Sequence, residues 1–173
     1  MSSSTASNLP TRDASSFASL TPNNLGTVRK LNSVLFPIKY SEKFTKTSSC
    51  PRSRTSANSC TITMSLVRLG TVCCRLENKD GQVSLYLMTM GILAPYRSRQ
   101  LGSTSLKLVL DAAAAHTKPK IDRIYLHVQI SNADAKKFYE RHGFAEIGVH
   151  ENYYKKIVPH DAWILEKRFT ETK

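Results

Sequence analysis

The sequence has no hydrophobic run long enough to cross a membrane. A membrane-spanning helix needs about 18 or more consecutive apolar residues, and no segment of the 173-residue chain approaches that length. The first residues show neither the charged start nor the apolar core of a secretory signal. We therefore expect a soluble, cytoplasmic protein with no membrane partner.

Cysteine is scarce and poorly placed for metal binding. The four cysteines, Cys50, Cys60, Cys73 and Cys74, show no paired CxxC spacing. They lack the pattern of a common metal site or of a disulfide framework. We expect reduced thiols and no bound metal.

Acidic residues are absent from one long stretch of a basic chain. The formal net charge is +12, and six basic but no acidic residues lie within residues 43–76. A continuous basic face would favour binding to phosphate, as in nucleic acid or the ribosome. Because half of the excess charge lies in this one region, we expect no direct, sequence-specific nucleic-acid partner.

The length and the 40% hydrophobic content indicate a single domain with its own core. Residues 1–20 are rich in Ser and Ala and predict a disordered tail, because they can bury little apolar surface. The domain is expected over residues 21–170. Within it, residues 45–65 hold 11 Ser or Thr in 21 positions and predict a loop or disorder.

Apolar spacing predicts a helix that starts near Leu25 and ends near Phe36. Two strands follow from residue 71, joined by a tight turn at Lys79, Asp80 and Gly81. A second helix is expected to reach about His116.

Strand-like alternation over residues 124–128 places Tyr125 and His127 on one face. Ser131 or Asn132 can cap a helix over residues 133–142, which Gly143 would end. Two more strands are expected over residues 144–150 and 162–168. This order of elements predicts an α/β fold with a mixed sheet.

The stretch YRSRQLGSTSLKLVL, residues 96–110, leads from two arginines through one glycine into a helix. Unpaired amides at a helix start favour an anion, and glycine lets a ligand approach the backbone. The loop can therefore hold a phosphate group. From these residues alone, an ordinary surface turn explains the pattern equally well.

The segments LYLMTMGILAPYR and IYLHVQISNADAKKFYERHGF resemble the GCN5-related N-acetyltransferase superfamily. With LNSVLFPIKY and NYYKKI, the chain is similar to N-terminal acetyltransferases of the NatE type. The resemblance covers residues 21–44 and 71–168. It implies a mixed central sheet with a splayed strand pair and flanking helices, and acetyl-CoA as the co-substrate.

The resemblance also implies where acetyl-CoA binds. A bulged strand over residues 86–91 would leave free amides for the pantetheine arm, and the loop over residues 97–103 would hold the pyrophosphate. Asn132 and Tyr139 would lie near the sulfur. The implied cofactor-binding residues are Met88, Met90, Gly91, Ile92, Arg97, Ser98, Arg99, Gly102, Ser103, Asn132 and Tyr139.

Tyr86 and His127 are the catalytic residues that the resemblance implies. Together they would position a water that removes a proton from an α-amine, which attacks the acetyl group directly. This demands little of a base, because an α-amine has a pKa of about 7.7 to 8.0. Taken alone, both residues are typical of half-buried positions on a strand.

The implied peptide site has aromatic and apolar walls, which suit an initiator methionine followed by an apolar residue. Its residues would be Phe36, Pro37, Ile38, Tyr40, Met88, Tyr153 and Tyr154. The implied partners are nascent protein N-termini, the catalytic and auxiliary subunits of the NatA complex and, through them, the ribosome.

One departure from the family pattern lies in the cofactor loop. An ungapped comparison with the family loop sets Gln100 in place of the first glycine, whereas a shift by two residues keeps that glycine as Gly102 but loses the second. A side chain in place of the first glycine would strain the backbone or crowd the pyrophosphate. The alternative function is therefore a weakly active or inactive scaffold subunit of a ribosome-associated acetyltransferase complex. A lysine or small-amine acetyltransferase is a third possibility, since fold alone does not select the acceptor.

A second departure is the segment 45–69, where the resemblance stops abruptly and then resumes. We hypothesise that this anomalous segment arises from a shifted reading frame or a misplaced splice. An intact in-frame transcript across its codons would contradict this hypothesis.

Overall fold

The computed structural model describes residues 17–19, 23, 25–36, 61–66, 69–79 and 81–169. Its elements are β1 (Phe17–Ser19), α1 (Leu25–Leu35), β2 (Thr61–Leu66), β3 (Gly70–Lys79), β4 (Gln82–Ile92), η1 (Ala94–Tyr96), α3 (Leu101–Ala114), β5 (Arg123–Gln129), α4 (Ala133–Arg141), β6 (Ala145–His150) and β7 (Ala162–Arg168).

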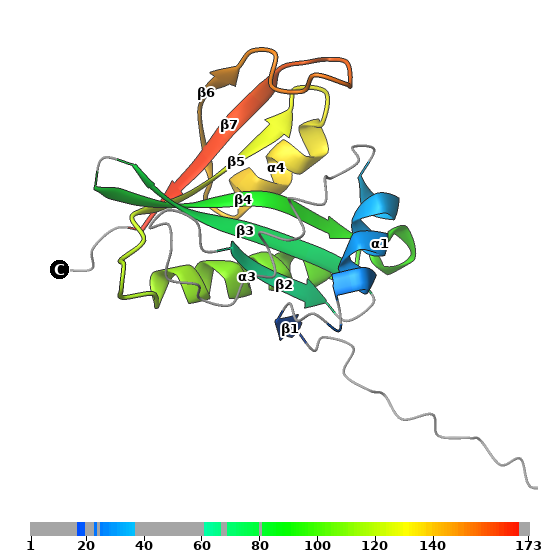
Figure 1. Ribbon diagram of the computed structural model, residues 1–173. Helices are drawn as coiled ribbons and strands as arrows, with labels where there is room; N and C mark the ends of the chain where they lie inside the picture. The colour runs from blue at the N-terminus through cyan, green and yellow to red at the C-terminus, as the bar shows by residue number, and fades with distance from the viewer. Residues whose placement is uncertain are drawn as a thin grey trace, which may run out of the picture.

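The strands form one sheet in the order β1-β2-β3-β4-β5-β7-β6 (Figure 1). Only β4 and β5 pair in parallel, whereas the other neighbours are antiparallel. The predicted mixed α/β sheet with flanking helices is therefore confirmed.

One face of the sheet packs against α3 and α4. Leu106 and Val109 of α3 and Tyr139 of α4 share a buried core with side chains of β3, β4 and β5. In β5 the buried residues are Ile124, Leu126 and Val128, and their neighbours Tyr125 and His127 are half-buried. The alternation predicted for this strand is confirmed, and it directs Tyr125 and His127 to the opposite face.

The opposite face carries α1, which lies at the end of β3 and β4 away from their hairpin turn (Figure 1). A Cβ atom at Gly91 of β4 would lie 3.0 Å from the ring of Phe36 and 3.2 Å from a methyl carbon of Leu35. The end of α1 can approach β4 this closely because residue 91 has no side chain. This contact positions Phe36 over the strand.

The predicted turns and caps agree with the structure. Gly81, in the β3–β4 turn, has φ of +82°, a left-handed value that glycine adopts without steric cost. Asn132 is the cap of α4, where its side chain accepts a hydrogen bond from the Ala135 amide at 3.1 Å. Gly143 follows α4, as expected for a helix end.

Two predictions about irregular segments are wrong in part. Residues 17–19 lie in the predicted disordered tail but form β1, and residues 61–66 of the anomalous segment form β2. The sequence TITMSL alternates polar and apolar residues, and the exposed edge of β3 offers it backbone partners. Residues 1–16, 20–22, 45–60, 67 and 68 lie outside the described residues.

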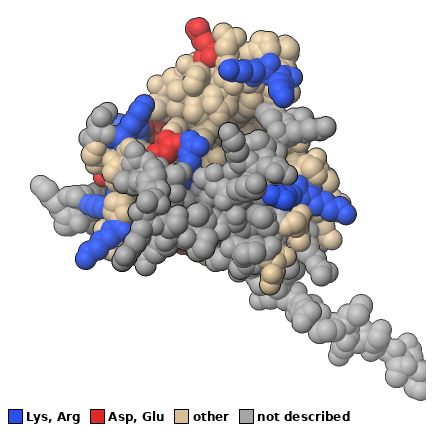
Figure 2. Space-filling model, viewed as in Figure 1, with Lys and Arg blue, Asp and Glu red and all other residues tan. Residues whose placement is uncertain are grey.

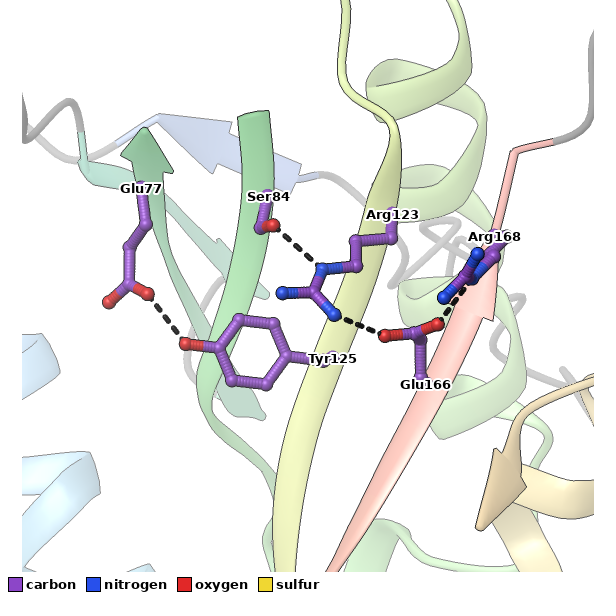
Figure 3. A network of polar contacts seen from close by, with 6 residues as sticks. All are labelled: Glu77, Ser84, Arg123, Tyr125, Glu166 and Arg168. Carbon is purple, nitrogen blue, oxygen red and sulfur yellow. Dashed lines mark hydrogen bonds and ion pairs between the residues drawn. The ribbon is translucent and has the colours of Figure 1, made fainter. Parts of the chain in front are cut away.

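Polar side chains link four strands where β4 and β5 begin (Figure 3). Arg123 donates to Ser84 at 2.9 Å and to Glu166 at 2.5 Å, and Arg168 donates to Glu166 at 2.6 Å. Beside them, the Tyr125 hydroxyl donates to Glu77 at 2.5 Å. These bonds hold β3, β4, β5 and β7 together at this end of the sheet.

Among the described residues, basic side chains do not form one continuous patch on the face seen in Figure 2. The described Lys and Arg residues lie there in separate groups. Among the helices that the structure describes, none is long and apolar enough to cross a membrane. The absence of a nucleic-acid partner remains a prediction.

Candidate active site

The strands β4 and β5 are neighbours for only a short distance. Their parallel pairing runs from Ser84 with Arg123 to Tyr86 with Tyr125 and then stops, although β4 continues to Ile92 and β5 to Gln129. The register of β3 against β4 also shifts between Cys73 and Cys74, so Met88 has no partner and forms a bulge. The predicted bulge and splay are both present.

The splay leaves backbone donors and acceptors on the inner edges of β4 and β5 without a strand partner. Such groups need hydrogen bonds, and a chain of amides such as pantetheine can supply them. Met88, Met90, Gly91 and Ile92 all lie on this part of β4. The residues present therefore fit acetyl-CoA, whose thioester supplies an activated acetyl group when it is bound.

The loop before α3 is shaped to hold an anion. The first hydrogen bond of α3 runs from the Thr104 amide to the Gln100 carbonyl at 2.9 Å. The amides of Leu101, Gly102 and Ser103 precede this ladder and can donate to a phosphate group. Arg97, Ser98 and Arg99 lie exposed just before them.

Gln100 adopts a left-handed backbone, with φ of 58° and ψ of 4°. Ser98 also has a positive φ, 61°. The glycine-like conformation of the loop is thus kept by residues that have side chains, and each carries strain. Helix α3 begins directly after Gln100, which agrees with the ungapped comparison to the family loop.

Gln100→Gly is expected to raise the free energy of unfolding by up to about 1 kcal/mol, because glycine adopts this φ without strain. It should also lower the Kd for acetyl-CoA, since no side chain then stands beside the free amides. Urea denaturation and calorimetry measure the two effects. Gln100→Ala is the matched control, since it keeps the Cβ atom. An equal gain from both variants would contradict the explanation.

Tyr86 and His127 come together with Tyr153, which lies after β6. The hydroxyl groups of Tyr86 and Tyr153 are hydrogen-bonded. The rings of His127 and Tyr153 are stacked, with centroids 4.1 Å apart and planes 6° from parallel. The Tyr86 and His127 rings meet edge to face at 5.6 Å. Residues distant in sequence therefore form one aromatic cluster on the face that carries α1.

Burial controls the protonation of this cluster. Burial and the neighbouring Tyr153 raise the pKa of Tyr86, so its hydroxyl stays protonated and can donate a hydrogen bond. Burial, assisted by His150, lowers the pKa of His127 to about 4. His127 is therefore neutral near pH 7 and able to accept a proton.

The His127 Nδ1 atom is buried and has no hydrogen-bond partner among the described residues. A buried polar atom without a partner is costly in a native structure. A bound substrate or a water molecule beside His127 would supply the missing bond.

Tyr139 and Asn132 occupy different surroundings on α4. Tyr139 is buried, touches Phe138 and Phe144 edge to face, and has a pKa that burial raises. The side chain of Asn132 is engaged as the helix cap. Their predicted places near the cofactor sulfur remain a proposal.

The predicted peptide site is only partly described. Phe36 lies at the end of α1 and Met88 at the bulge of β4. Tyr154 donates its amide to the His160 carbonyl at 2.8 Å, and its ring meets that of Tyr153 at 4.8 Å. Pro37, Ile38 and Tyr40 lie outside the described residues.

Sequence reasoning missed two neighbours of the cluster. His150 of β6 approaches His127, and Tyr125 stacks on Tyr86 at 4.9 Å. Tyr125 was placed on the correct face, but its partner Glu77 lies 48 positions away. No local pattern could have paired them.

Metal binding finds no support in the part of the chain that the structure describes. Among those residues, no group of three or more His, Cys, Asp or Glu side chains could hold a metal ion.

Comparisons with known proteins agree with this geometry. Residues 35–144 match the acetyltransferase (GNAT) family. The chain is 39% identical to N-alpha-acetyltransferase 50 of Danio rerio over 148 residues, which are 86% of this chain and 84% of that protein. It is 35% identical to the probable N-acetyltransferase san of Drosophila melanogaster over 162 residues, which are 94% of this chain and 85% of the relative.

A solved structure is also similar. Arabidopsis thaliana Naa50, in complex with the bisubstrate analogue CoA-Ac-MVNAL, matches with a TM-score of 0.72 and 37% identity over 89% of this chain and 98% of that chain. The family match covers more than half of the chain. The chain therefore belongs to the acetyltransferase (GNAT) family, within which it resembles N-alpha-acetyltransferase 50.

Proposed function

We propose that this protein is an N-terminal acetyltransferase that moves acetyl from acetyl-CoA directly to the α-amine of protein N-termini that begin with Met. The observation that carries the proposal is the splay of β4 from β5 beside the Tyr86–His127 cluster. Its similarity to a structure that holds CoA joined to a Met-starting peptide supports the choice of acceptor.

In the proposed mechanism, the free backbone edges of the splayed strands hold the pantetheine arm, and the amides at the start of α3 hold the pyrophosphate. His127 is neutral and receives a proton from the substrate ammonium through a water molecule. Tyr86, which stays protonated, orients that water. A backbone amide of β4 donates to the acetyl carbonyl oxygen. As the bond from nitrogen to the acetyl carbon forms, the carbon–sulfur bond breaks, and the CoA thiolate takes the second proton of the amine and leaves as the thiol.

The second residue of the substrate is proposed to be apolar. Phe36 lies over Gly91 of β4, Met88 forms the bulge of the same strand, and the Tyr154 ring meets that of Tyr153. Apolar and aromatic surface of this kind would exclude charged side chains. The chain is further proposed to act in the cytoplasm as a NatE-type enzyme bound to NatA subunits at the ribosome. The sequence resemblance supports this last step.

One observation favours a second candidate function. Gln100 and Ser98 both place a side chain on left-handed backbone in the loop before α3, and a side chain that crowds the pyrophosphate there would weaken acetyl-CoA binding. A scaffold subunit with little activity is the function that such weakening predicts.

An acetylation assay tests the proposal. Peptides that begin with Met-Leu or Met-Val are expected to be acetylated at their α-amine, in preference to peptides that begin with Ser or Asp. An N-terminally blocked peptide with an internal lysine is the control, and its faster acetylation would contradict the proposal. Calorimetry tests the second candidate function, because a scaffold subunit is expected to show no binding of acetyl-CoA.

A further inference from the structure

A second imidazole contacts His127 from the end of β6. The Nδ1 atom of His150 lies 3.4 Å from Nε2 of His127, with ring centroids 5.3 Å apart. Tyr153 contacts both rings, stacking on His127 at 4.1 Å and meeting His150 at 5.2 Å. One tyrosine therefore keeps the two histidines in place.

The two nitrogens of His127 have different surroundings. Nδ1 is buried and has no partner in the described part of the chain, whereas Nε2 faces His150. His127 is half-buried and His150 is exposed. An imidazole can accept a proton on one nitrogen and release another from the second. The pair thus forms a path from a buried nitrogen to solvent.

We infer that His150 is the residue through which the proton taken from the substrate amine leaves the site. This inference rests on the proposed function. An N–H bond of the ammonium breaks, and its proton moves through a water molecule beside the cluster to Nδ1 of His127. The Nε2–H bond of His127 then breaks as an N–H bond forms at Nδ1 of His150. His150 releases a proton from its Nε2 to bulk water.

After product release, both histidines return to their starting tautomers by exchanging protons with water: His127 loses its Nδ1 proton and regains one at Nε2, and the exposed His150 loses its Nδ1 proton and regains one at Nε2. No oxidant, reductant or further reactant takes part. His150 is a positioning and relay residue in this scheme and does not touch the reacting atoms.

The buried tyrosine hydroxyls around His127 do not compete for the proton. Burial raises the pKa values of Tyr86 and Tyr125, and raises that of Tyr154 to about 12, so these hydroxyls stay protonated. The pKa of Glu77 is lowered, because bonds from Tyr125 and Arg75 outweigh its burial, and it stays a carboxylate. Tyr153 contacts both imidazoles, and Glu151 adjoins His150 in the chain.

His150→Gln tests the inference, with His116→Gln as the matched control. His116 lies beyond the end of α3, where its Nδ1 is bonded to the Pro119 carbonyl. We expect His150→Gln to lower kcat about tenfold near pH 6.5 and to approach the wild type near pH 9, where hydroxide and the free amine remove the need for a relay. The Kd for acetyl-CoA and the Tm should stay unchanged. An unaltered kcat at every pH would overturn the inference.

Chemical rescue separates proton transfer from a structural role. Added imidazole is expected to restore the rate of His150→Ala but not that of His127→Ala. If a folded His150→Ala variant that still binds acetyl-CoA gains nothing from imidazole, the relay is wrong.

A titration of the histidine rings by NMR needs no turnover. Because His150 helps to lower the pKa of His127, its replacement by Gln should raise that pKa, and an unchanged value would count against the relay. If the wild type instead fails to acetylate Met-starting peptides, the proposed function fails, and this titration still tests the pair.

Discussion

His127→Ala is expected to lower kcat for a Met-starting peptide by about 10²-fold to 10⁴-fold, the usual contribution of a positioned base. The Kd for acetyl-CoA should remain nearly unchanged, because the splayed strands and the loop before α3 would hold it. Steady-state kinetics and calorimetry separate the two quantities. Loss of both together would indicate misfolding rather than a missing base.

Tyr86→Phe provides a second test of the same cluster. It keeps the ring that stacks on Tyr125 and removes the hydroxyl that bonds to Tyr153. Its kcat should fall less than that of His127→Ala, since His127 can still accept the proton. A larger fall would assign the main role to Tyr86.

The low pKa of His127 also predicts how stability depends on pH. Its folded value of about 4 lies below the ordinary 6.5, so the unfolded chain binds this proton more readily between those values. The contribution of neutral His127 to folding is therefore complete above pH 6.5 and is lost as the pH falls towards 4. The difference in stability between the wild type and His127→Ala should change in this interval and level off above it.

Arg123→Met is expected to lower the free energy of unfolding by about 2 kcal/mol or more, because removing one partner leaves a buried carboxylate poorly compensated. Figure 3 shows Glu166 between Arg123 and Arg168. The side chain of Glu166 is only 4% exposed, and that of Arg123 is 32% exposed. The remaining partner, Arg168, is 76% exposed. Urea denaturation measures the loss.

The double variant Arg123→Met with Glu166→Gln should be more stable than Arg123→Met alone, since a neutral amide needs no opposite charge. Bonds from Arg168 and Arg123 outweigh burial and lower the pKa of Glu166 from its ordinary 4.5. The stabilisation that the two arginines give through the Glu166 carboxylate is thus present above pH 4.5 and is lost as the pH falls below it. The loss of unfolding free energy caused by Arg123→Met should therefore become smaller below pH 4.5. A loss that stays the same at low pH would show that the charge of Glu166 is not its cause.

The elements predicted from sequence are those whose patterns are local. Helix α1 follows from its apolar spacing, the β3–β4 turn from Gly81, and the two faces of β5 from simple alternation. Strand β1 was missed because it is a short edge strand held by backbone bonds to β2, which lies far along the chain. Strand β2 was missed because the Ser- and Thr-rich composition around it predicted a loop.

The candidate site depended on more than local pattern. Tyr86 and His127 were paired through family resemblance, and the splay that separates their strands could not be derived from composition or spacing. His150 reaches His127 only because β7 lies between β5 and β6 and sets their registers. Tertiary arrangements of this kind are not encoded in any single window of sequence.

The close contact between Gly91 and the end of α1 has a consequence for substrate binding. Gly91 belongs to the strand proposed to hold the pantetheine arm, while Phe36, which touches it, is a proposed wall of the peptide pocket. If β4 shifts when acetyl-CoA binds, Phe36 and therefore the wall of the peptide pocket would shift with it. The two substrates would then bind with mutual influence, and the order in which they arrive would matter.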